Sequence, residues 1–499
     1  MSDWGGVYLA GGAVALSTLA FYLSSNSASA KAKRLGARLP PGPPKAVLVG
    51  NLFNFPNGRW YETFSEWAKE YGDVVHVDLA GVHMIILNSL EAIQELAEKR
   101  MIHAGRPYST MVCDLMMEGF TMVLSQPGPD FKEQRRIFHG SIGPQAIKEY
   151  DSLILQRSLE LLEALSKFEG DVFPLLMRVV GGILTTIAYG EKIYQDHGER
   201  LVAINTENIG LIAYAFTQIW SVDIFPPLRY LPTWIPGFTF PKIGARAYYL
   251  ASQIRYWSFG AVKKAVAEGS ADDSLVSRYL ANPIVSEDNL RDAVAVMWGA
   301  GADTTVTSIV NFLFSIVVFP EWQIKIQEEI DEVVGHDQVP NINNISKLKI
   351  FNAVWKESFR WNASVPLGVP HMSTQEDVWN GYYIPKQTIL HCNIGFITRD
   401  PRLWGNDSHE FKPLRFHPDF NPNLDKLPDI MSIPFGFGRR ICPGRFLAER
   451  ISRQIVAAIL SKYTVTPLEG EEVTADMQFV DAAIRRPADF RCRFIPRYS

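Results

Sequence analysis

One cysteine in this sequence stands where a metal ion could be bound. Cys442 lies in PFGFGRRICPGRFLAER, residues 434–450, ahead of a pattern that predicts a helix from Arg445 to Leu460. Pro443 is favoured in the first turn of a helix, so we expect Cys442 at a helix N-terminus. There the helix dipole and the free N–H groups favour a thiolate, which is the form of cysteine that binds metals.

The surroundings of Cys442 favour one kind of metal site. Gly438 and Gly444 leave space on either side of the cysteine, as is needed where a flat, bulky cofactor lies against the backbone. A single thiolate suits haem iron, because the macrocycle supplies the equatorial ligands. Taken alone, a lone buried cysteine is more often inert packing. The four cysteines include no C-x-x-C pair, which argues against a zinc knuckle and against a disulfide-rich scaffold.

A second candidate for chemistry lies in an apolar segment. Residues 296–319, VMWGAGADTTVTSIVNFLFSIVVF, are apolar on nearly every face and predict a buried central helix. Burying Asp303 there is costly unless the carboxyl is solvated or takes part in chemistry. Thr304 is spaced to donate a hydrogen bond to the carbonyl of Ala300 and so to loosen the helix. A polar kink in a core helix is the alternative interpretation.

The elements that must position these groups are mostly helices. Residues 150–168 and 321–335 are amphipathic with a period near 3.6. Residues 72–87, with their alternation broken at Gly81, and residues 382–394 predict strands. The chain has 499 residues, 47% of them hydrophobic, so it can bury a large core. Beyond residue 45 no repeat or flexible linker divides it, which predicts one large domain.

These motifs resemble those of the cytochrome P-450 superfamily, the haem-thiolate monooxygenases. The resemblance extends across the chain and implies a mainly α cytochrome P-450 fold, a large helical domain around haem with a small β-rich region. It implies that Cys442 is the axial thiolate ligand of the haem iron, that Phe435 shields the sulfur and that Arg440 pairs with a haem propionate. The haem-binding signature F-x-x-G-x-R-x-C-x-G is matched at Phe435, Gly438, Arg440, Cys442 and Gly444.

The resemblance also implies catalytic and structural roles. The stretch AGADTT resembles the central-helix motif of the family, so Asp303 and Thr304 are implied to deliver protons during the activation of O2. Glu357 and Arg360 in KESFRWN resemble the family's E-x-x-R pair, and Arg415 in FKPLRF is the third member of that group. The i, i+3 spacing taken alone favours an ordinary surface ion pair.

Two positions depart from the family pattern. Phe131 stands where the family usually has tryptophan, so the indole N–H donor is missing beside Arg135 and haem anchoring is weaker by on the order of 1 kcal/mol. Leu414 replaces the usual glutamate of the FKPLRF stretch, a change that touches only the surface there. Besides Arg135, the resemblance implies haem propionate contacts at His371 and Arg106.

The resemblance further implies a substrate pocket with an apolar, sulfur-rich lining. Such a lining desolvates a greasy molecule well and disfavours a charged one. Asp114 and Glu118 are exceptions, because either could pair with an amine if it turned inward. The residues that the resemblance places in the pocket are Met116, Met117, Phe120, Phe216, Val296, Ala300, Val365, Leu367 and Ile484.

Residues 368–404 are similar to the fungal secondary-metabolism branch that includes the O-methylsterigmatocystin oxidoreductases. The expected reaction is hydroxylation or further oxidation of a small apolar secondary metabolite, a terpenoid first and an aromatic polyketide or indole amine second. A lyase or isomerase of the same fold and a haem sensor or carrier are the alternatives. The sensor needs no proton relay and such lyases often lack one, so Asp303 and Thr304 disfavour both.

The electrons are expected to come from a separate protein. The chain has no flavin module and no strand-turn-helix G-x-G-x-x-G fingerprint, so NADPH must be oxidised elsewhere. The resemblance implies a membrane-bound NADPH–cytochrome P-450 reductase. Its docking face would use basic residues that, taken singly, also fit a solvated surface: Lys132, Arg136, Arg439 and Arg445. The net charge of −4 gives no general basic surface, so no nucleic-acid partner is expected.

The N-terminal segment predicts a membrane anchor. Residues 4–23, WGGVYLAGGAVALSTLAFYL, carry no charge and are long enough to span a bilayer once. A cleaved signal peptide is the alternative, but its basic n-region is missing. The basic residues follow the span, which predicts a single-pass endoplasmic reticulum protein with a cytosolic catalytic domain. The expected parts are the anchor (1–30), a basic and proline-rich linker (31–45) and the haem-thiolate catalytic domain (46–499).

Overall fold

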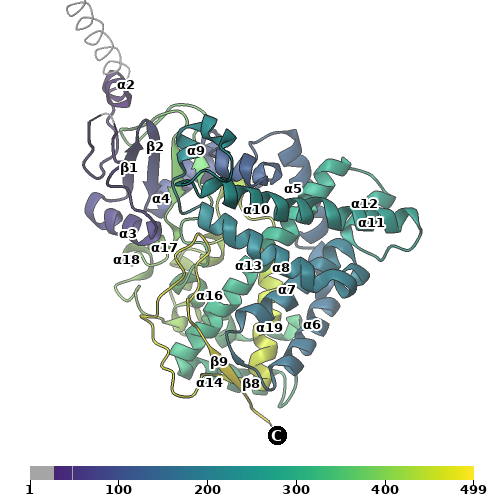
Figure 1. Ribbon diagram of the computed structural model, residues 1–499. Helices are drawn as coiled ribbons and strands as arrows, with labels where there is room; N and C mark the ends of the chain where they lie inside the picture. Colours follow the sequence, from purple (N-terminus) through teal and green to yellow (C-terminus); the bar gives the residue numbers. More distant parts are fainter. Residues whose placement is uncertain (1–26, 48, 499) are drawn as a thin grey trace, which may run out of the picture. The chain divides into compact units, whose positions relative to one another are not determined.

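The computed structural model describes residues 27–47 and 49–498, which form a mainly helical fold with three small β-sheets (Figure 1). Contacts along the described chain separate it into two compact units, each formed from discontinuous segments. Unit 1 contains residues 27–55, 64–107 and 370–392, and unit 2 contains residues 56–63, 108–369 and 393–498.

Unit 1 is built on a four-stranded sheet of order β1-β2-β7-β4. Strands β1 (Val74–Leu79) and β2 (Val82–Leu87) form an antiparallel hairpin, and the two residues between them, 80 and 81, have positive φ. Strand β7 (Ile389–Cys392) joins β2 in parallel and β4 (His371–Met372) in antiparallel register. A separate hairpin is formed by β5 (Asp377–Trp379) and β6 (Tyr382–Ile384). The strands predicted in residues 72–87 and 382–394 are confirmed.

The predicted linker belongs to unit 1. Helix α2 (Ala28–Arg34) covers its start, and the proline-rich stretch 39–45 contains no helix, as its prolines predict. The carbonyl of Pro41 accepts a hydrogen bond from the N–H of His76 at 2.8 Å. The side-chain amide of Asn51 donates to the carbonyl of Pro43 at 3.1 Å. These bonds hold the stretch against β1 and the segment that precedes it.

Unit 2 is a bundle of helices around α13 (Glu287–Val318), which is apolar on all sides and largely buried. Helix α13 packs against α5 (Pro129–Ile142), α7 (Phe173–Tyr189) and α19 (Arg445–Lys462) (Figure 1). The buried central helix predicted over residues 296–319 is confirmed. It runs as one continuous α-helix through residue 304, so the expected loosening does not interrupt it.

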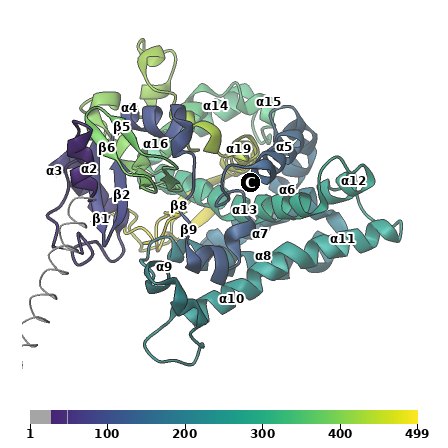
Figure 2. The same cartoon turned by 90° about the horizontal axis from the view of Figure 1, so that it is seen from above.

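Two long helical runs cover another part of unit 2. Helix α8 (Glu191–Ala215) lies beside α10 (Phe240–Ser252), which continues through η7 (Gln253–Trp257) into α11 (Ser258–Ala267) (Figure 2). The helices predicted over residues 150–168 and 321–335 are α6 (Asp151–Leu165) and α14 (Pro320–Val333), and both predictions are confirmed.

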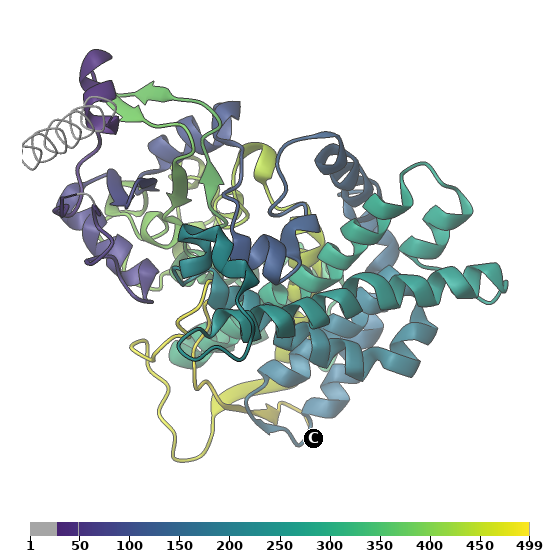
Figure 3. The same ribbon diagram turned by 45° about the horizontal axis from the view of Figure 1, so that its top comes forward.

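The remaining strands and helices complete the described chain. Strands β8 (Tyr463–Pro467) and β9 (Cys492–Pro496) form an antiparallel pair near the C-terminus, drawn in yellow in Figure 3. Strand β3 (Glu169–Gly170) pairs with the other edge of β9. The other α-helices are α3 (Trp60–Tyr71), α4 (Leu90–Ile93), α9 (Ser221–Ile224), α12 (Leu275–Ala281), α15 (Ile342–Ile345), α16 (Lys349–Trp361), α17 (Ile394–Ile397) and α18 (Pro401–Trp404). Short turns of 3-10 or π helix include η3 (Thr110–Leu115), η4 (Glu118–Phe120), η6 (Pro226–Tyr230), η8 (Pro413–Phe416) and η11 (Gly438–Arg440).

The hydropathy of the described helices singles out α13. Within residues 27–47 and 49–498, α13 is the one helix long and apolar enough to cross a bilayer, and most of its apolar window is buried, as in the core helix of a folded domain. The membrane span predicted for residues 4–23 lies outside the described residues.

Candidate active site

Cys442 lies in a loop directly before α19. Its N–H donates to the carbonyl of Phe435 at 2.7 Å, which closes the loop, and Gly438 has a φ of +56° that favours glycine. The thiol accepts hydrogen bonds from the backbone N–H groups of Gly444 and Arg445. The predicted position at a helix N-terminus is therefore confirmed.

Burial opposes the effect of this helix end on the pKa of the thiol. Burial raises the pKa of Cys442, while the N–H of Gly444 and the positive charge of Arg135 lower it to a smaller extent. The N–H groups at the helix terminus favour the thiolate, as predicted, but desolvation of the charged sulfur outweighs them, so the pKa of the free thiol is raised. Binding of a metal ion to this sulfur would release the thiol proton.

Two guanidinium groups lie in contact with the cysteine loop. Arg135, on α5, donates from Nη1 to the carbonyl of Ile441 at 2.7 Å. Arg440, on η11, donates from Nη2 to the carbonyl of Ser125 at 2.8 Å. Both lie near the ring of Phe131, with centroid distances of 6.0 Å for Arg135 and 4.3 Å for Arg440. The phenylalanine that replaces the family's tryptophan therefore contacts both cations through its ring.

This arrangement fits an anionic cofactor. Burial and, secondarily, the charge of Arg135 lower the pKa of Arg440 to about 10. In the described part of the chain Arg135 has no ion pair, and burial lowers its pKa as well. Two like charges at buried or partly buried positions, of which Arg135 lowers the pKa of Arg440, are stabilised by an anion. A sulfur donor beside two such cations suits haem, which binds iron centrally and carries carboxylates at its edge.

The middle of α13 differs from the rest of the helix. Ala300 is exposed and Thr304 is half-buried, although the helix around them is buried. The Oγ1 of Thr304 donates to the carbonyl of Ala300 at 2.9 Å, so this predicted hydrogen bond is confirmed. Burial raises the pKa of Asp303, and the charge of Arg486 partly opposes that rise. A carboxyl that keeps its proton to higher pH than an exposed aspartate is suited to proton transfer.

Glu357 and Arg360 form a fully buried pair on α16. The guanidinium of Arg360 donates from Nε and Nη2 to both carboxylate oxygens of Glu357, each at 2.7 Å. The Nε of Arg415, on η8, lies 3.7 Å from Glu357. Neither member of the α16 pair has exposed side-chain surface, so the alternative of a surface ion pair is wrong. Arg360 also donates to the carbonyl of Thr398 at 3.0 Å and thereby joins α16 to the segment after α17.

Two of the predicted propionate contacts belong to unit 1. The Nη1 of Arg106 donates to the carbonyl of Pro370 at 2.7 Å. The Nδ1 of His371, at the start of β4, donates to the carbonyl of His103 at 3.0 Å. Both side chains are buried. All other predicted site residues belong to unit 2.

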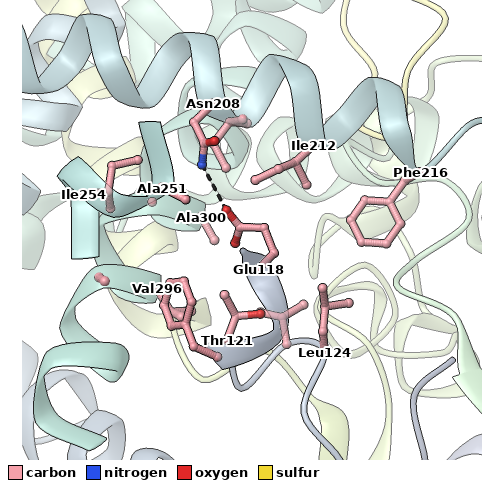
Figure 4. Close-up of a pocket in the computed structure, with 15 residues that line it drawn as sticks. Glu118, Thr121, Leu124, Asn208, Ile212, Phe216, Ala251, Ile254, Val296 and Ala300 are labelled. Atoms are coloured by element: carbon pink, nitrogen blue, oxygen red, sulfur yellow. Dashed lines mark hydrogen bonds between the residues drawn. The ribbon is translucent and has the colours of Figure 1, made fainter. Parts of the chain in front are cut away.

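Unit 2 contains a cavity that reaches the exposed part of α13 (Figure 4). Its empty volume is about 570 Å³, part of which is open to solvent. The surrounding elements are η4, α8, the end of α10, η7 and α13. The lining is mostly apolar: Phe120, Val123, Leu124, Ile209, Ile212, Phe216, Ala251, Ile254, Ala295, Val296, Gly299 and Ala300, with Glu118, Thr121 and Asn208 as the polar members.

The predicted pocket residues fall into two groups. Four of them line this cavity: Phe120, Phe216, Val296 and Ala300. Met116 is fully buried in the hydrophobic cluster around η3, because its side chain packs against the core beneath that turn. The others do not line the cavity: Met117, Val365, Leu367 and Ile484. Met117 has a φ of +61°, which is uncommon for a residue other than glycine.

The cavity contains one functional group that the sequence did not reveal. Asn208, on α8, is buried and donates from Nδ2 to Oε1 of Glu118 at 3.1 Å. Asn205 and Asn208 are three residues apart on the buried face of α8. Two amides on an apolar helix face are the sequence feature that could have predicted a polar group in the cavity. Of the two acidic exceptions, Glu118 turns inward, whereas Asp114 is held by Arg229 at 2.8 Å.

The four basic residues predicted for partner docking are placed on α5, η11 and α19. Lys132 and Arg439 are exposed. Arg136 is exposed and lies 3.5 Å from Glu133, one turn earlier on α5. Arg445 lies against the ring of Phe446 at 4.5 Å. Positive charge is therefore available on the exposed parts of these elements.

Comparison with known proteins gives a consistent result. A family model described as Cytochrome P450 matches residues 40–491. Cytochrome P450 monooxygenase 176 of Postia placenta is 31% identical over 473 residues, which cover 92% of this chain and 90% of the relative. Cytochrome P450 monooxygenase claT of Ampulloclitocybe clavipes is 30% identical, with 92% of each chain covered. Cytochrome P450 monooxygenase COX1 of Coprinopsis cinerea is 30% identical, with coverage of 97% of this chain and 98% of the relative.

Proposed function

Because this chain belongs to the cytochrome P450 family and is a haem-thiolate monooxygenase, we propose that it hydroxylates or further oxidises an apolar small molecule, a terpenoid secondary metabolite first. The cavity beside Ala300 is the observation that carries this proposal. Its lining is mostly apolar, and it reaches the helix that bears Asp303 and Thr304. An apolar lining of this kind favours a substrate with few polar groups.

The cofactor site is formed by residues near the start of α19. Cys442 would supply the sulfur ligand, and the N–H groups of Gly444 and Arg445 orient its thiol. Arg135 and Arg440 supply the positive charges that bind the carboxylates at the haem edge. When bound, haem with a thiolate ligand activates O2 and supplies the oxygen atom that is inserted into the substrate.

Proton handling is assigned to α13. The raised pKa of Asp303 lets its carboxyl hold a proton and release it inside the protein. The hydroxyl of Thr304 donates to the carbonyl of Ala300 and keeps its oxygen available as an acceptor. The cavity reaches α13 at Ala300, one turn before Thr304. The same helix therefore lines the substrate cavity and carries the proton donors.

Electrons are supplied by a membrane-bound NADPH–cytochrome P450 reductase. The basic residues on α5, η11 and α19 provide the docking charge for an acidic flavoprotein surface. Because steering of this kind is electrostatic, the rate of reduction should fall as the salt concentration rises.

The protein is anchored in the endoplasmic reticulum membrane by its N-terminal segment, with the catalytic part in the cytosol. A second contact is supplied by the exposed side chains of η6 and the loop that follows. Tyr230 is 83% exposed and Trp234 is 76% exposed, and such amphipathic rings favour the membrane interface. Phe238, in the same loop, is half-buried against the cluster around η3, so Trp234 carries more of this contact.

An aromatic polyketide or an indole amine is the second candidate substrate. The carboxyl of Glu118 favours it, because this acid lines an otherwise apolar cavity and would pair with an amine. The two substrate classes differ in charge and are therefore separable in binding measurements.

The proposed function is tested by reconstitution. Purified holoprotein, reductase, NADPH and O2 should convert a terpenoid panel into products that are heavier by one oxygen atom. A reaction without reductase and one without NADPH are the controls. Turnover that needs neither would favour a lyase or isomerase, and a haem-loaded protein without turnover on any panel would favour a sensor or carrier.

A further inference from the structure

The cavity holds one carboxyl group, and that group is deeply buried. Glu118 is 8% exposed and projects from η4 toward α8, where it meets Asn208, which is 3% exposed (Figure 4). Ile212 and Phe216 on one side, and Val296 on α13, complete an apolar enclosure around the pair. A polar pair in such surroundings is costly to bury unless its hydrogen-bonding capacity is used.

Much of that capacity is unused within the protein. Among the described residues, the carboxyl of Glu118 takes part in one hydrogen bond, from Asn208 Nδ2 to Oε1 at 3.1 Å, and in no ion pair. The Oδ1 atoms of Asn208 and of Asn205, one turn away on α8, are buried and have no partner within the described chain. The two amide oxygens accept hydrogen bonds, and so does the carboxylate of Glu118 when it is ionised, so a donor group is complementary to this part of the protein.

The cationic side chains nearby do not pair with Glu118. Arg255, on η7, binds both carboxylate oxygens of Asp292, at 2.6 and 2.8 Å. Asp114, in the same segment as Glu118, binds Arg229 and the hydroxyl of Tyr108. Arg255 and Arg229 are therefore each bound to another carboxylate and do not pair with Glu118.

We infer that Glu118 and Asn208 form a polar anchor that selects a substrate whose apolar body carries one hydrogen-bond-donating group, an O–H or a protonated N–H. This inference rests on the proposed function, because it narrows the substrate class of the same cavity. A pure hydrocarbon fills the apolar volume but leaves the acceptors without partners, and each buried acceptor without a partner weakens binding. A donor removes that cost and fixes the orientation of the substrate relative to α13.

The ionisation of Glu118 is compatible with both donor types. Burial raises its pKa to about 7, and the hydrogen bond from Asn208 partly opposes that rise. Near neutral pH the carboxyl is therefore close to its midpoint. An incoming ammonium favours the ionised form and brings the cation that the cavity lacks, whereas a hydroxyl is accepted without any change in net charge.

The test uses three probes with one carbon skeleton: adamantane, 1-adamantanol and N,N-dimethyl-1-adamantanamine, whose tertiary nitrogen hinders iron ligation. Their dissociation constants are measured on holoprotein by the Soret shift and, independently of the haem spectrum, by equilibrium dialysis. For each probe the ratio of variant to wild-type affinity cancels differences in probe hydrophobicity. Glu118→Leu should weaken the alcohol and the amine about tenfold and leave adamantane unchanged.

A second variant separates the two donor types. Glu118→Gln keeps an oxygen that accepts from Asn208 and a neutral acceptor for a hydroxyl, so the fold is preserved. If wild type binds the amine more tightly than the alcohol, and Glu118→Gln loses affinity for the amine but not for the alcohol, the anchor selects a cationic substrate. If Glu118→Gln keeps the affinity for the alcohol and the amine, and Glu118→Leu loses the affinity for both, the anchor selects a hydroxylated substrate. Asp114→Asn is the matched control, because that carboxyl is bound on the outer side by Arg229.

The inference is overturned if Glu118→Leu changes all three affinities equally, or changes none. If Glu118→Leu does not fold, two results together overturn the inference. Glu118→Gln binds the alcohol and the amine as tightly as wild type does, and wild type binds neither of them more tightly than adamantane. Failure of the proposed function gives a different result. Glu118-dependent binding without NADPH-dependent turnover rejects the monooxygenase reaction and keeps the anchor, whereas turnover with binding that ignores Glu118 rejects the anchor alone.

Discussion

The guanidinium of Arg360 donates two hydrogen bonds of 2.7 Å to the carboxylate of Glu357, and neither side chain has any exposed surface. The N–H of Lys412 also donates to Glu357, at 2.7 Å, and Arg360 donates to the carbonyls of Thr398 and Ser408. The pair therefore joins α16 to the chain on both sides of α18. This connection makes it a structural centre of unit 2.

Removing one partner of this pair should destabilise the protein strongly. Arg360→Leu leaves the Glu357 carboxylate buried without its main partner, which costs about 3–5 kcal/mol. The measurement is urea unfolding of the holoprotein, followed by near-ultraviolet circular dichroism. Lys263→Ala, which removes an exposed ion pair with Glu287, is the control and should change stability by less than about 1 kcal/mol. Equal losses in the two variants would contradict the structural role.

Replacing the proposed ligand should remove the spectral signature of the thiolate. The reduced, carbon-monoxide-bound protein should show the red-shifted absorption band of the family, because a thiolate opposite carbon monoxide produces it. Cys442→Ser should lack this band, whereas Cys492→Ser, a buried cysteine on β9, should keep it. A band that survives in Cys442→Ser would show that another residue is the ligand.

Changing the hydroxyl on α13 should divert electrons without preventing binding. Thr304→Val removes the Oγ1 that donates to Ala300 and should raise peroxide formation per NADPH several-fold, since protons are delivered less well. Thr304→Ser keeps the hydroxyl and should keep most of the coupling. The measurement is product and peroxide yield per NADPH consumed, with substrate affinity as the check on folding. The role of Thr304 fails if both variants remain fully coupled.

The raised pKa of Glu118 predicts a pH-dependent penalty on stability. The folded protein holds this proton up to about pH 7, whereas the unfolded chain releases it near its ordinary pKa, so wild-type stability falls as the pH rises between these values. Glu118→Gln has no such proton. Without ligand it should equal wild type at about pH 4 and exceed it by up to roughly 3 kcal/mol at about pH 8.

Urea unfolding at a series of pH values measures this difference. Other buried groups with raised pKa values, Asp223, Asp303 and Cys113, are common to both proteins and cancel in the comparison. A stability difference that does not change between these pH values would mean that Glu118 titrates as an exposed carboxyl.

Membrane attachment should depend on two separate regions. Deleting residues 1–30 should move part of the haem-loaded protein from the membrane pellet into the supernatant. Adding Trp234→Ser to the deletion should release more, since this exposed ring is the proposed second contact. Phe420→Ser, at an exposed aromatic residue on another surface segment, is the control and should release no more than the deletion alone. Full retention of the truncated protein would place the main attachment elsewhere.

Features with a local cause were predictable from the sequence. The helix after Cys442 follows from the helical pattern of residues 445–460, although Pro443 lies before its first turn, and the hairpin β1–β2 follows from alternation interrupted at Gly81. The hydrogen bond of Thr304 follows from its spacing to Ala300 in one helix. Each of these depends on residues within a few positions of one another.

Features that depend on tertiary packing were not predictable. The inward turn of Glu118 needs Asn208, which is 90 positions away in the sequence on α8. The direction of the pKa shift at Cys442 depends on how deeply the loop is covered, and the helix end alone suggested the opposite sign. Sequence spacing gives neighbours on one element, but it does not say which side chains of two distant elements face one cavity.

The parallel pairing of β7 with β2 has a consequence for synthesis on the ribosome. Residues 84–87 are translated early, yet their partner residues 389–392 emerge only after most of unit 2 has been made. During that interval the nascent chain carries an open strand edge with unsatisfied N–H and C=O groups, which is a template for wrong pairing. Chaperone demand should therefore peak before residue 392 is translated, and chains that stop short of it should aggregate more than chains that stop just beyond it.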